Sequence, residues 1–284
     1  MITISAPAKI NLTLEVLGKR ADGYHEIRSV IQTISLFDTL KFEEADKLEF
    51  HSMSENWVAE KSLVSRAIEL LKELTGTTKG ASITIEKHIP LLSGLGGDSS
   101  DAAATLLGLN GLWKLGLYYK QLLPLATELG SDVAFFLDGG TAMVAGRGEK
   151  VTIIPLMPHR WVVLSVPAIP RILGKTGLLY KSLTPDHYTD GHITDKLVEV
   201  LELGGKFDPG MMFNVFEKVA FNVYPGLDSV RQKMKELGIS DIRLAGSGPA
   251  LFSLFREKKE AENVYSHLKR QGLESYLVET LSVG

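Results

Sequence analysis

Apolar and polar residues alternate first and then fall into helical spacing along the N-terminal half of the chain. From Ile10 to Val16 every second residue is apolar, which predicts a half-buried strand. Leucines and alanines recur at helical spacing over Ser62–Thr75, and Gly76 stands where a helix would end. Further strands are predicted at Val30–Leu36, Leu40–Glu43, Leu48–Phe50 and Ser82–Lys87, and further helices at Ser99–Trp113 and Tyr119–Leu129.

The pattern of residues changes around residues 151–159, where Pro155 and Pro158 lie close together. We place a domain boundary there and expect domains at 1–155 and 156–284. The pattern beyond it mixes helices and strands without a regular βαβ alternation, so the fold class is α+β. Strands are predicted at Trp161–Val166, Ile242–Ala245, Leu251–Phe255 and Ser275–Thr280, and helices at Thr194–Leu203, Asn214–Phe221, Leu227–Leu237 and Lys258–Gln271.

Composition narrows the function classes. The net charge of the 284 residues is only -3, which gives no electrostatic reason to expect a nucleic acid or a membrane surface as partner. The chain has no cysteine, which excludes disulfides, thiolate metal sites and a cysteine nucleophile. Its apolar stretches are too short to span a bilayer and its N-terminus does not resemble a signal peptide. A soluble, cytoplasmic protein is expected.

The most informative segment is glycine-rich. It reads Pro90, Leu91, Leu92, Ser93, Gly94, Leu95, Gly96, Gly97, Asp98, Ser99, Ser100. Glycines let backbone amides approach an anion, and the helix predicted to follow has free N–H groups at its start. The segment is not a Walker loop, and it lacks the third glycine of a dinucleotide fingerprint. Taken alone, it is equally consistent with a capped glycine turn or a phosphate-binding loop.

The order Pro, three residues, Gly-Leu-x-Gly-x-Ser-Ser resembles the second motif of the GHMP kinases. Other segments match that family in the same order, in the form found in its diphosphocytidyl-methylerythritol kinases. They are Pro7–Leu12, Gly23–Ile27, Leu129–Leu137 with Gly139–Ala142 and Gly146–Glu149, and Leu244–Phe252.

The resemblance implies a two-domain fold, with a ribosomal-protein-S5-like N-terminal domain and a ferredoxin-like C-terminal domain. It implies that Pro90–Ser100 together with Gly246, Ser247 and Gly248 hold the phosphates of ATP, bridged by Mg²⁺ with ligands that the sequence does not identify. Asp132 would be the general base and Lys9 its partner.

The resemblance also implies a small-molecule substrate, a cytidine diphosphate-linked methylerythritol. Asn11, Tyr24, His25 and Tyr180 would contact it, with the tyrosines stacking on the base and His25 reading its edge. The adenine pocket is expected along Trp57–Leu63. Asp98 departs from the family pattern, because glycine or serine is usual there and a carboxylate would face phosphate. The sequence leaves a monomer or a homodimer open.

Each key residue has a plain structural reading as well. Lys9 alone would be a surface charge and Asp132 alone a helix-terminal residue, while Tyr24, His25 and Tyr180 could be turn or core residues. Two other functions also stay open: another GHMP kinase, for homoserine or a mevalonate-type alcohol, and a catalytically silent binding protein of the same fold. The aromatic turn argues against the first, and retention of Lys9 with Asp132 against the second.

Overall fold

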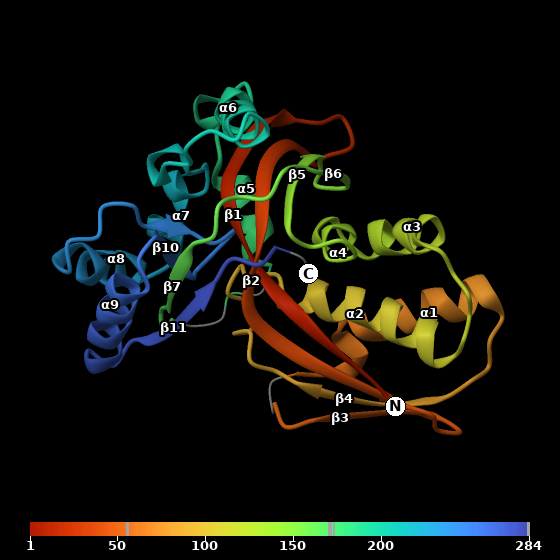
Figure 1. The fold of residues 1–284 in the computed structure, drawn as a ribbon. Helices are drawn as coiled ribbons and strands as arrows, with labels where there is room; N and C mark the ends of the chain where they lie inside the picture. Colours follow the sequence, from red (N-terminus) through yellow and green to blue (C-terminus); the bar gives the residue numbers. More distant parts are fainter. Residues whose placement is uncertain (55–56, 170–171, 173, 283–284) are drawn as a thin grey trace.

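The computed structural model describes residues 1–54, 57–169, 172 and 174–282, and its larger sheet belongs mainly to the N-terminal half (Figure 1). The strand order is β3-β4-β2-β1-β8, with β5 paired to β2 and β6 to β5. The strands are β1 (Ile2–Lys19), β2 (His25–Glu43), β3 (Leu48–Ser52), β4 (Ala81–Glu86), β5 (Thr141–Gly146), β6 (Lys150–Ile153) and β8 (Phe213–Asn214).

Strand β1 is longer than predicted and is buried on both faces, so the prediction of a half-buried strand was wrong. Its polar face is covered by helix α6 (His192–Glu202). The Thr13 hydroxyl accepts a hydrogen bond from Thr194 Oγ1 at 2.9 Å, and the Glu15 carboxylate accepts one from the Thr194 amide at 2.7 Å. Hydrogen bonds to covering elements thus allow polar residues to be buried where alternation alone suggests solvent.

The two strands predicted at Val30–Leu36 and Leu40–Glu43 form a single strand, β2. It pairs with β1 over nearly its whole length, with register shifts at Pro7/Ala8, Asn11/Thr13 and Val16/Gly18. Such bulges bend and twist a strand without ending it. The β1–β2 pair therefore runs through the sheet as one long twisted hairpin, and residues of both strands border the cavity described below.

Four helices follow or precede the glycine-rich segment: α1 (Leu63–Thr75), α2 (Gly97–Leu112), α3 (Tyr119–Leu129) and α4 (Ser131–Phe135). Helix α1 ends at Gly76 with φ 68°, as its sequence predicts. Helix α2 packs on β1 and β2, and α1 packs on α2. Helix α4 begins at Ser131, beside Asp132, which the sequence allows as a helix-terminal residue, but its five residues are too few to show a helical period.

The smaller sheet has the antiparallel order β11-β7-β10-β9. With its helices it follows the βαββαβ arrangement of ferredoxin-like domains, which confirms the α+β class. The strands are β7 (Trp161–Val166), β9 (Arg243–Leu244), β10 (Leu251–Phe255) and β11 (Glu274–Glu279), and the helices are α5 (Lys175–Ser182), α6, α7 (Glu217–Val223), α8 (Leu227–Glu236) and α9 (Lys258–Arg270).

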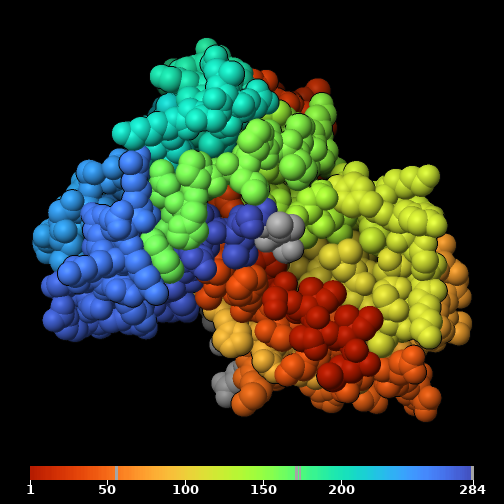
Figure 2. All heavy atoms as spheres, in the orientation of Figure 1, coloured from red at the N-terminus to blue at the C-terminus, as the bar shows by residue number. Residues whose placement is uncertain are grey.

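Backbone hydrogen bonds, as well as the connecting chain, join the two halves of the molecule. An isolated bridge links Ile34 to Thr280, and β8 from the second half pairs with β1. Figure 2 shows the C-terminal residues massed on one side, the N-terminal residues on the other and the green segment crossing between them. The division at residues 155 and 156 remains a prediction. Within the described ranges, no helix combines the length and apolar character needed to cross a bilayer.

Candidate active site

A cavity of about 900 Å³ lies where the two halves meet. It is bordered by β1, the start of β2, the Pro90–Gly97 loop, the start of α4, helix α5 and the turn at Gly246 and Ser247. Its volume lies within the range of pockets that hold small ligands. Segments that lie more than two hundred residues apart in the sequence therefore line one cavity.

Lys9 and Asp132 face each other in this cavity. Lys9 Nζ lies 3.3 Å from Asp132 Oδ2 and donates a 2.8 Å hydrogen bond to Asn11 Oδ1. Asn11 Nδ2 in turn donates to Ser29 Oγ at 2.9 Å. Lys9 is almost fully buried, whereas the Asp132 side chain keeps 35% of its surface exposed. A fixed cation thus sits beside a carboxylate that a substrate hydroxyl can reach.

The glycine-rich loop is hydrogen-bonded to both halves of the chain. The Lys9 amide donates to the Leu95 carbonyl at 2.9 Å, and the Ala250 amide donates to the Ser93 carbonyl at 3.0 Å. Gly94 has φ 89°, and a Cβ there would come within 2.0 Å of the Ala245 carbonyl oxygen. Glycine is therefore required at this position by backbone conformation and by space.

The turn at residues 246–248 is held by two residues that were not predicted as site residues. Asn214 Nδ2 donates to the carbonyl oxygens of Leu244 and Gly246, each at 2.8 Å. The Tyr224 hydroxyl donates to the Ser247 carbonyl at 2.7 Å. Strand β8 and the residue that follows helix α7 thus fix the turn that faces the glycine loop.

Beneath the loop, Lys87 connects three carboxylates. Its Nζ lies 2.5 Å from Asp38, 2.7 Å from Asp101 and 3.9 Å from Asp98. Burial raises the pKa of Asp101 to about 7, against the lowering effect of Lys87. The nearby ammonium offsets the Asp98 charge, which accounts for a carboxylate in a loop of this type.

Aromatic side chains gather at the opposite end of the cavity. The rings of His25 and Tyr180 stack with centroids 4.7 Å apart, and Tyr180 meets Phe216 edge-on at 4.9 Å. Arg147 lies over the half-exposed ring of Tyr24 at 5.0 Å. Burial lowers the pKa of His25, so its ring is neutral near pH 7 and offers both a donor and an acceptor.

Known proteins show the same organisation. The GHMP kinases N terminal domain matches residues 62–140 and the GHMP kinases C terminal domain matches residues 198–273. A protein of Dehalococcoides mccartyi named 4-diphosphocytidyl-2-C-methyl-D-erythritol kinase is 50% identical over 99% of both chains. A Bacillus cereus protein of the same name is 41% identical over 99% of this chain and 97% of its own.

The chain belongs to the GHMP kinases. Among solved structures it resembles a 4-(cytidine 5'-diphospho)-2C-methyl-D-erythritol kinase, with TM-score 0.82 and 32% identity over 98% of this chain and 99% of the other. A homoserine kinase from Cytophaga hutchinsonii shares the fold at TM-score 0.76 and 20% identity, covering 99% and 95% of the two chains.

Most residues that the sequence singled out meet in the cavity of this GHMP kinase. Leu95, Ser100 and Gly248 are not among its lining residues in the described chain: Leu95 is fully buried in the core and Ser100 lies beneath the loop. Those that line it are Lys9, Asn11, Tyr24, His25, Pro90, Leu91, Leu92, Ser93, Gly94, Gly96, Gly97, Asp98, Ser99, Asp132, Tyr180, Gly246 and Ser247.

The lining also differs from the sequence prediction in two respects. None of the residues from Trp57 to Leu63 borders the cavity, so the expected adenine-pocket segment lies outside its lining. Conversely, Lys87, Arg147, Lys175 and Tyr188 border it without having been predicted as site residues. Arg147 stood within a quoted motif and Lys175 five positions before Tyr180, whereas nothing in the sequence marked Tyr188.

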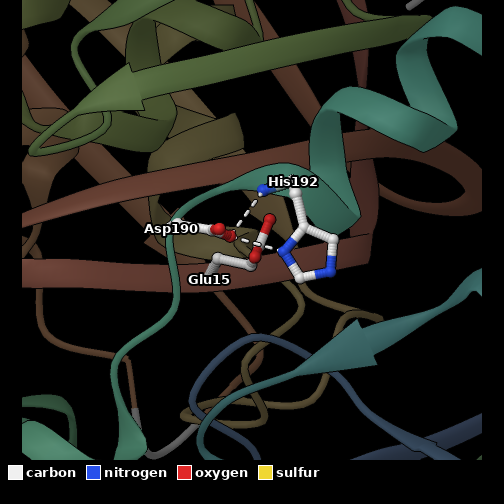
Figure 3. A group of neighbouring side chains, drawn as sticks. All are labelled: Glu15, Asp190 and His192. Carbon is white, nitrogen blue, oxygen red and sulfur yellow. Dashed lines mark hydrogen bonds and ion pairs between the residues drawn. The ribbon is translucent and has the colours of Figure 1, made fainter.

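A second cluster of ionisable groups lies at the end of the β1–β2 ribbon in this kinase (Figure 3). Glu15, Asp190 and His192 each place one polar atom within 4.8 Å of the others. Glu15 caps the start of α6 through the Thr194 amide, and Asp190 raises the pKa of His192. The Arg28 guanidinium lies beside Gly191 and pairs with Asp195, with Nη1 2.5 Å from Oδ2.

Proposed function

We propose that this protein transfers the γ-phosphoryl group of ATP to the C2 hydroxyl of 4-diphosphocytidyl-2-C-methyl-D-erythritol, a step of non-mevalonate isoprenoid precursor biosynthesis. The observation that carries the proposal is the placement of the Lys9–Asp132 pair in one cavity, between a glycine loop and an aromatic cluster. A phosphate donor and a base-bearing acceptor then meet at the pair. The full-length relatives with this name support it.

In this reaction Asp132 accepts the proton of the tertiary hydroxyl. A bond forms between the C2 oxygen and the γ-phosphorus while the bond to the β,γ-bridging oxygen breaks, and ADP leaves with the electron pair. Lys9 stabilises the negative charge that develops between acceptor and phosphate, and Asn11 fixes the Lys9 ammonium. Proton transfer to a positioned base contributes about 10²–10⁴-fold.

The phosphates of ATP are assigned to the amides of the glycine-rich loop from Gly94 to Ser99 and of the turn at Gly246 and Ser247. The Ser100 and Gly248 amides instead donate to the Gly96 and Ala245 carbonyls within the chain. Mg²⁺ would neutralise phosphate charge there, and it takes oxygen ligands. The loop offers two such ligands: the carboxylate of Asp98 and the hydroxyl of Ser100, which is buried and has no hydrogen-bond partner in the described chain. An orphan buried oxygen beside a phosphate loop fits a cation ligand.

The cytidine end of the substrate is assigned to Tyr24, His25 and Tyr180. The parallel His25 and Tyr180 rings leave no room for a base between them at 4.7 Å, so a cytosine would stack on an outer face of this group or on Tyr24. A neutral His25 ring retains a donor and an acceptor for the base edge. Arg147, above Tyr24, can pair with the diphosphate.

The alternatives explain less of the cavity. Homoserine and mevalonate contain no base, so an aromatic cluster at the acceptor end would have no partner in them. A silent binding protein would not need a carboxylate beside a buried lysine.

We further propose that the enzyme acts in the cytoplasm, where its two substrates are soluble. We propose that it is a monomer or a homodimer and that its two domains are divided near residue 155.

The direct test is ADP release by the purified protein with ATP and Mg²⁺. Diphosphocytidyl-methylerythritol, homoserine and mevalonate are offered in parallel, and ³¹P NMR identifies the product. We expect a phosphomonoester only with the cytidine compound. Turnover of another alcohol would contradict the substrate but keep the chemistry, and no turnover with any of them would favour a binding protein.

A further inference from the structure

Lys175 is the first residue of helix α5 and is buried at the wall of the cavity. Only 7% of its surface is exposed. Its Nζ donates to Ser247 Oγ at 3.1 Å and to the Gly248 carbonyl, so it reaches the same turn that faces the glycine loop. It also borders a second, smaller cavity of about 250 Å³ behind Pro90–Ser93. The ammonium therefore lies next to the proposed position of the phosphates.

This ammonium has no ionic partner in the part of the chain that the structure describes. No carboxylate lies within 4.0 Å of it, whereas Lys9 has one such partner and Lys87 has three. The ionisable groups that face it are Lys9 from β1, Asp132 from α4 beyond Lys9, Tyr224 after α7 and Glu274 at the rim of the second cavity. Burial without a counter-ion is costly for a cation.

We propose that Lys175 is a phosphate ligand of the ATP site, a second cation that approaches the β- and γ-phosphates from the C-terminal half while Lys9 approaches from the N-terminal half. The assignment rests on the proposed function, because it takes the cavity to be the ATP site. It names a residue that contacts the transferred group and that is separate from the base and its partner.

Two cations on either side of the transferred group match what phosphoryl transfer needs. Charge spreads over the equatorial oxygens of the γ-phosphoryl in the transition state, and fixed cations stabilise it. A lysine held by Ser247 and Gly248 is already oriented and needs only a small rotation to exchange the carbonyl for a phosphate oxygen. The anion then supplies the missing counter-charge.

A consequence is that ATP binding draws a proton. Burial, with the charge of Lys9, lowers the pKa of Lys175 to about 7, so the side chain is mostly neutral at pH 8 in the free enzyme. A phosphate beside it favours the charged form and raises that pKa. Binding at pH 8 should therefore take up close to one proton at Lys175, and binding at pH 6 almost none.

A purely structural lysine would hold the turn by hydrogen bonds and would show none of this. Three variants distinguish a phosphate-binding lysine from a lysine that only holds the turn. Lys175→Arg keeps the charge but cannot deprotonate, Lys175→Gln keeps a hydrogen-bond donor without charge, and Lys175→Met keeps only the length. Thermal melting of each variant reports whether the fold has survived.

The experiment is isothermal titration of ATP and of AMP into the wild type and the three variants, in buffers of different ionisation enthalpy at pH 6 and 8. We expect Lys175→Gln and Lys175→Met to bind ATP about 10- to 100-fold more weakly with AMP unchanged, and Lys175→Arg to stay within a few-fold. At pH 8 the wild type should take up close to one proton more per ATP bound than Lys175→Arg does. Protons bound or released by ATP itself contribute equally to both proteins and cancel in this difference.

Equal ATP affinity in Lys175→Gln and the wild type, or equal proton uptake in the wild type and Lys175→Arg, would overturn the assignment. A wild type that binds no ATP at all would instead contradict the proposed function. If Lys175→Gln melts far below the wild type, the comparison of proton uptake between the wild type and Lys175→Arg still decides the question.

Discussion

The ring of His25 stacks on the ring of Tyr180, 4.7 Å away and within 17° of parallel. His25 opens strand β2 and Tyr180 belongs to helix α5, so the contact joins the two halves of the molecule at the acceptor end of the cavity. Tyr180 is supported from behind by Phe216. The proposed base-recognition site is thus completed only when both halves have folded together.

Replacing Tyr180 should weaken the binding of the cytidine substrate without affecting the binding of ATP. Tyr180→Leu removes the face on which His25 rests, and loss of one stacking partner corresponds to about 1–3 kcal/mol. We expect KM for the cytidine substrate to rise about 5- to 100-fold, with KM for ATP unchanged. Tyr180→Phe, the matched control, keeps the ring and should resemble the wild type in steady-state kinetics. Equal KM values for the leucine and phenylalanine variants would show that stacking is not what the residue contributes.

Gly94→Ala should disconnect the phosphate loop from the C-terminal turn. The new Cβ would collide with the Ala245 carbonyl oxygen, in addition to the cost of positive φ. The control is Gly116→Ala, which has a similar φ of 69° and open space around the Cβ, so it carries only the conformational cost of about 1–2 kcal/mol. Thermal denaturation with and without ATP should show a larger loss of stability, and loss of ATP protection, only in Gly94→Ala.

Lys87 should be essential for stability. It is buried between Asp38 and Asp101, and Lys87→Met would leave two carboxylates together without a cation. Breaking a buried pair in this way costs about 3–5 kcal/mol. Urea unfolding measures it, with Lys41→Met as control, because Lys41 pairs with Glu86 in partly exposed surroundings. A loss no larger than that of Lys41→Met would contradict a stabilising function of the cluster.

Asp101 should make stability depend on pH in an unusual direction. Burial raises the pKa of Asp101 in the folded protein to about 7, well above the usual value of an aspartate. The stabilisation from its protonated form is therefore complete at low pH and is lost as the pH rises through 7. Relative to the wild type, Asp101→Asn should gain stability between pH 5 and pH 8 in urea unfolding. Parallel stability curves for the two proteins would refute the shift.

The sequence predicted most elements and most of the site, for identifiable reasons. Amphipathic helices such as α1 and α9 and the bounded strand β7 carry clear periodicity, and their bounds agree within a residue or two. Short elements such as α4 have too few residues to show a period. The full burial of β1 could not be seen, because the elements that cover it come from distant parts of the chain.

The same distinction applies to the site. Lys9, Asp132 and the glycine loop stand in motifs, so the sequence marked them. Lys175, Asn214 and Tyr224 act through positions that only folding creates: each contacts the backbone or a side chain of residues 244–248 from a different element. Alternation and spacing carry no signal for such contacts.

The measurement that tests the central claim most directly is single-turnover phosphoryl transfer by Asp132→Asn, with ATP, Mg²⁺ and the cytidine substrate. Its control is Asp138→Asn. The Asp138 carboxylate lies outside the cavity and accepts a hydrogen bond from the Tyr119 hydroxyl. We predict a fall of about 10²–10⁴-fold in the rate of transfer, unchanged binding of both substrates, and a control that behaves like the wild type. A rate within a few-fold of the wild type in Asp132→Asn would contradict the assignment of Asp132 as the base.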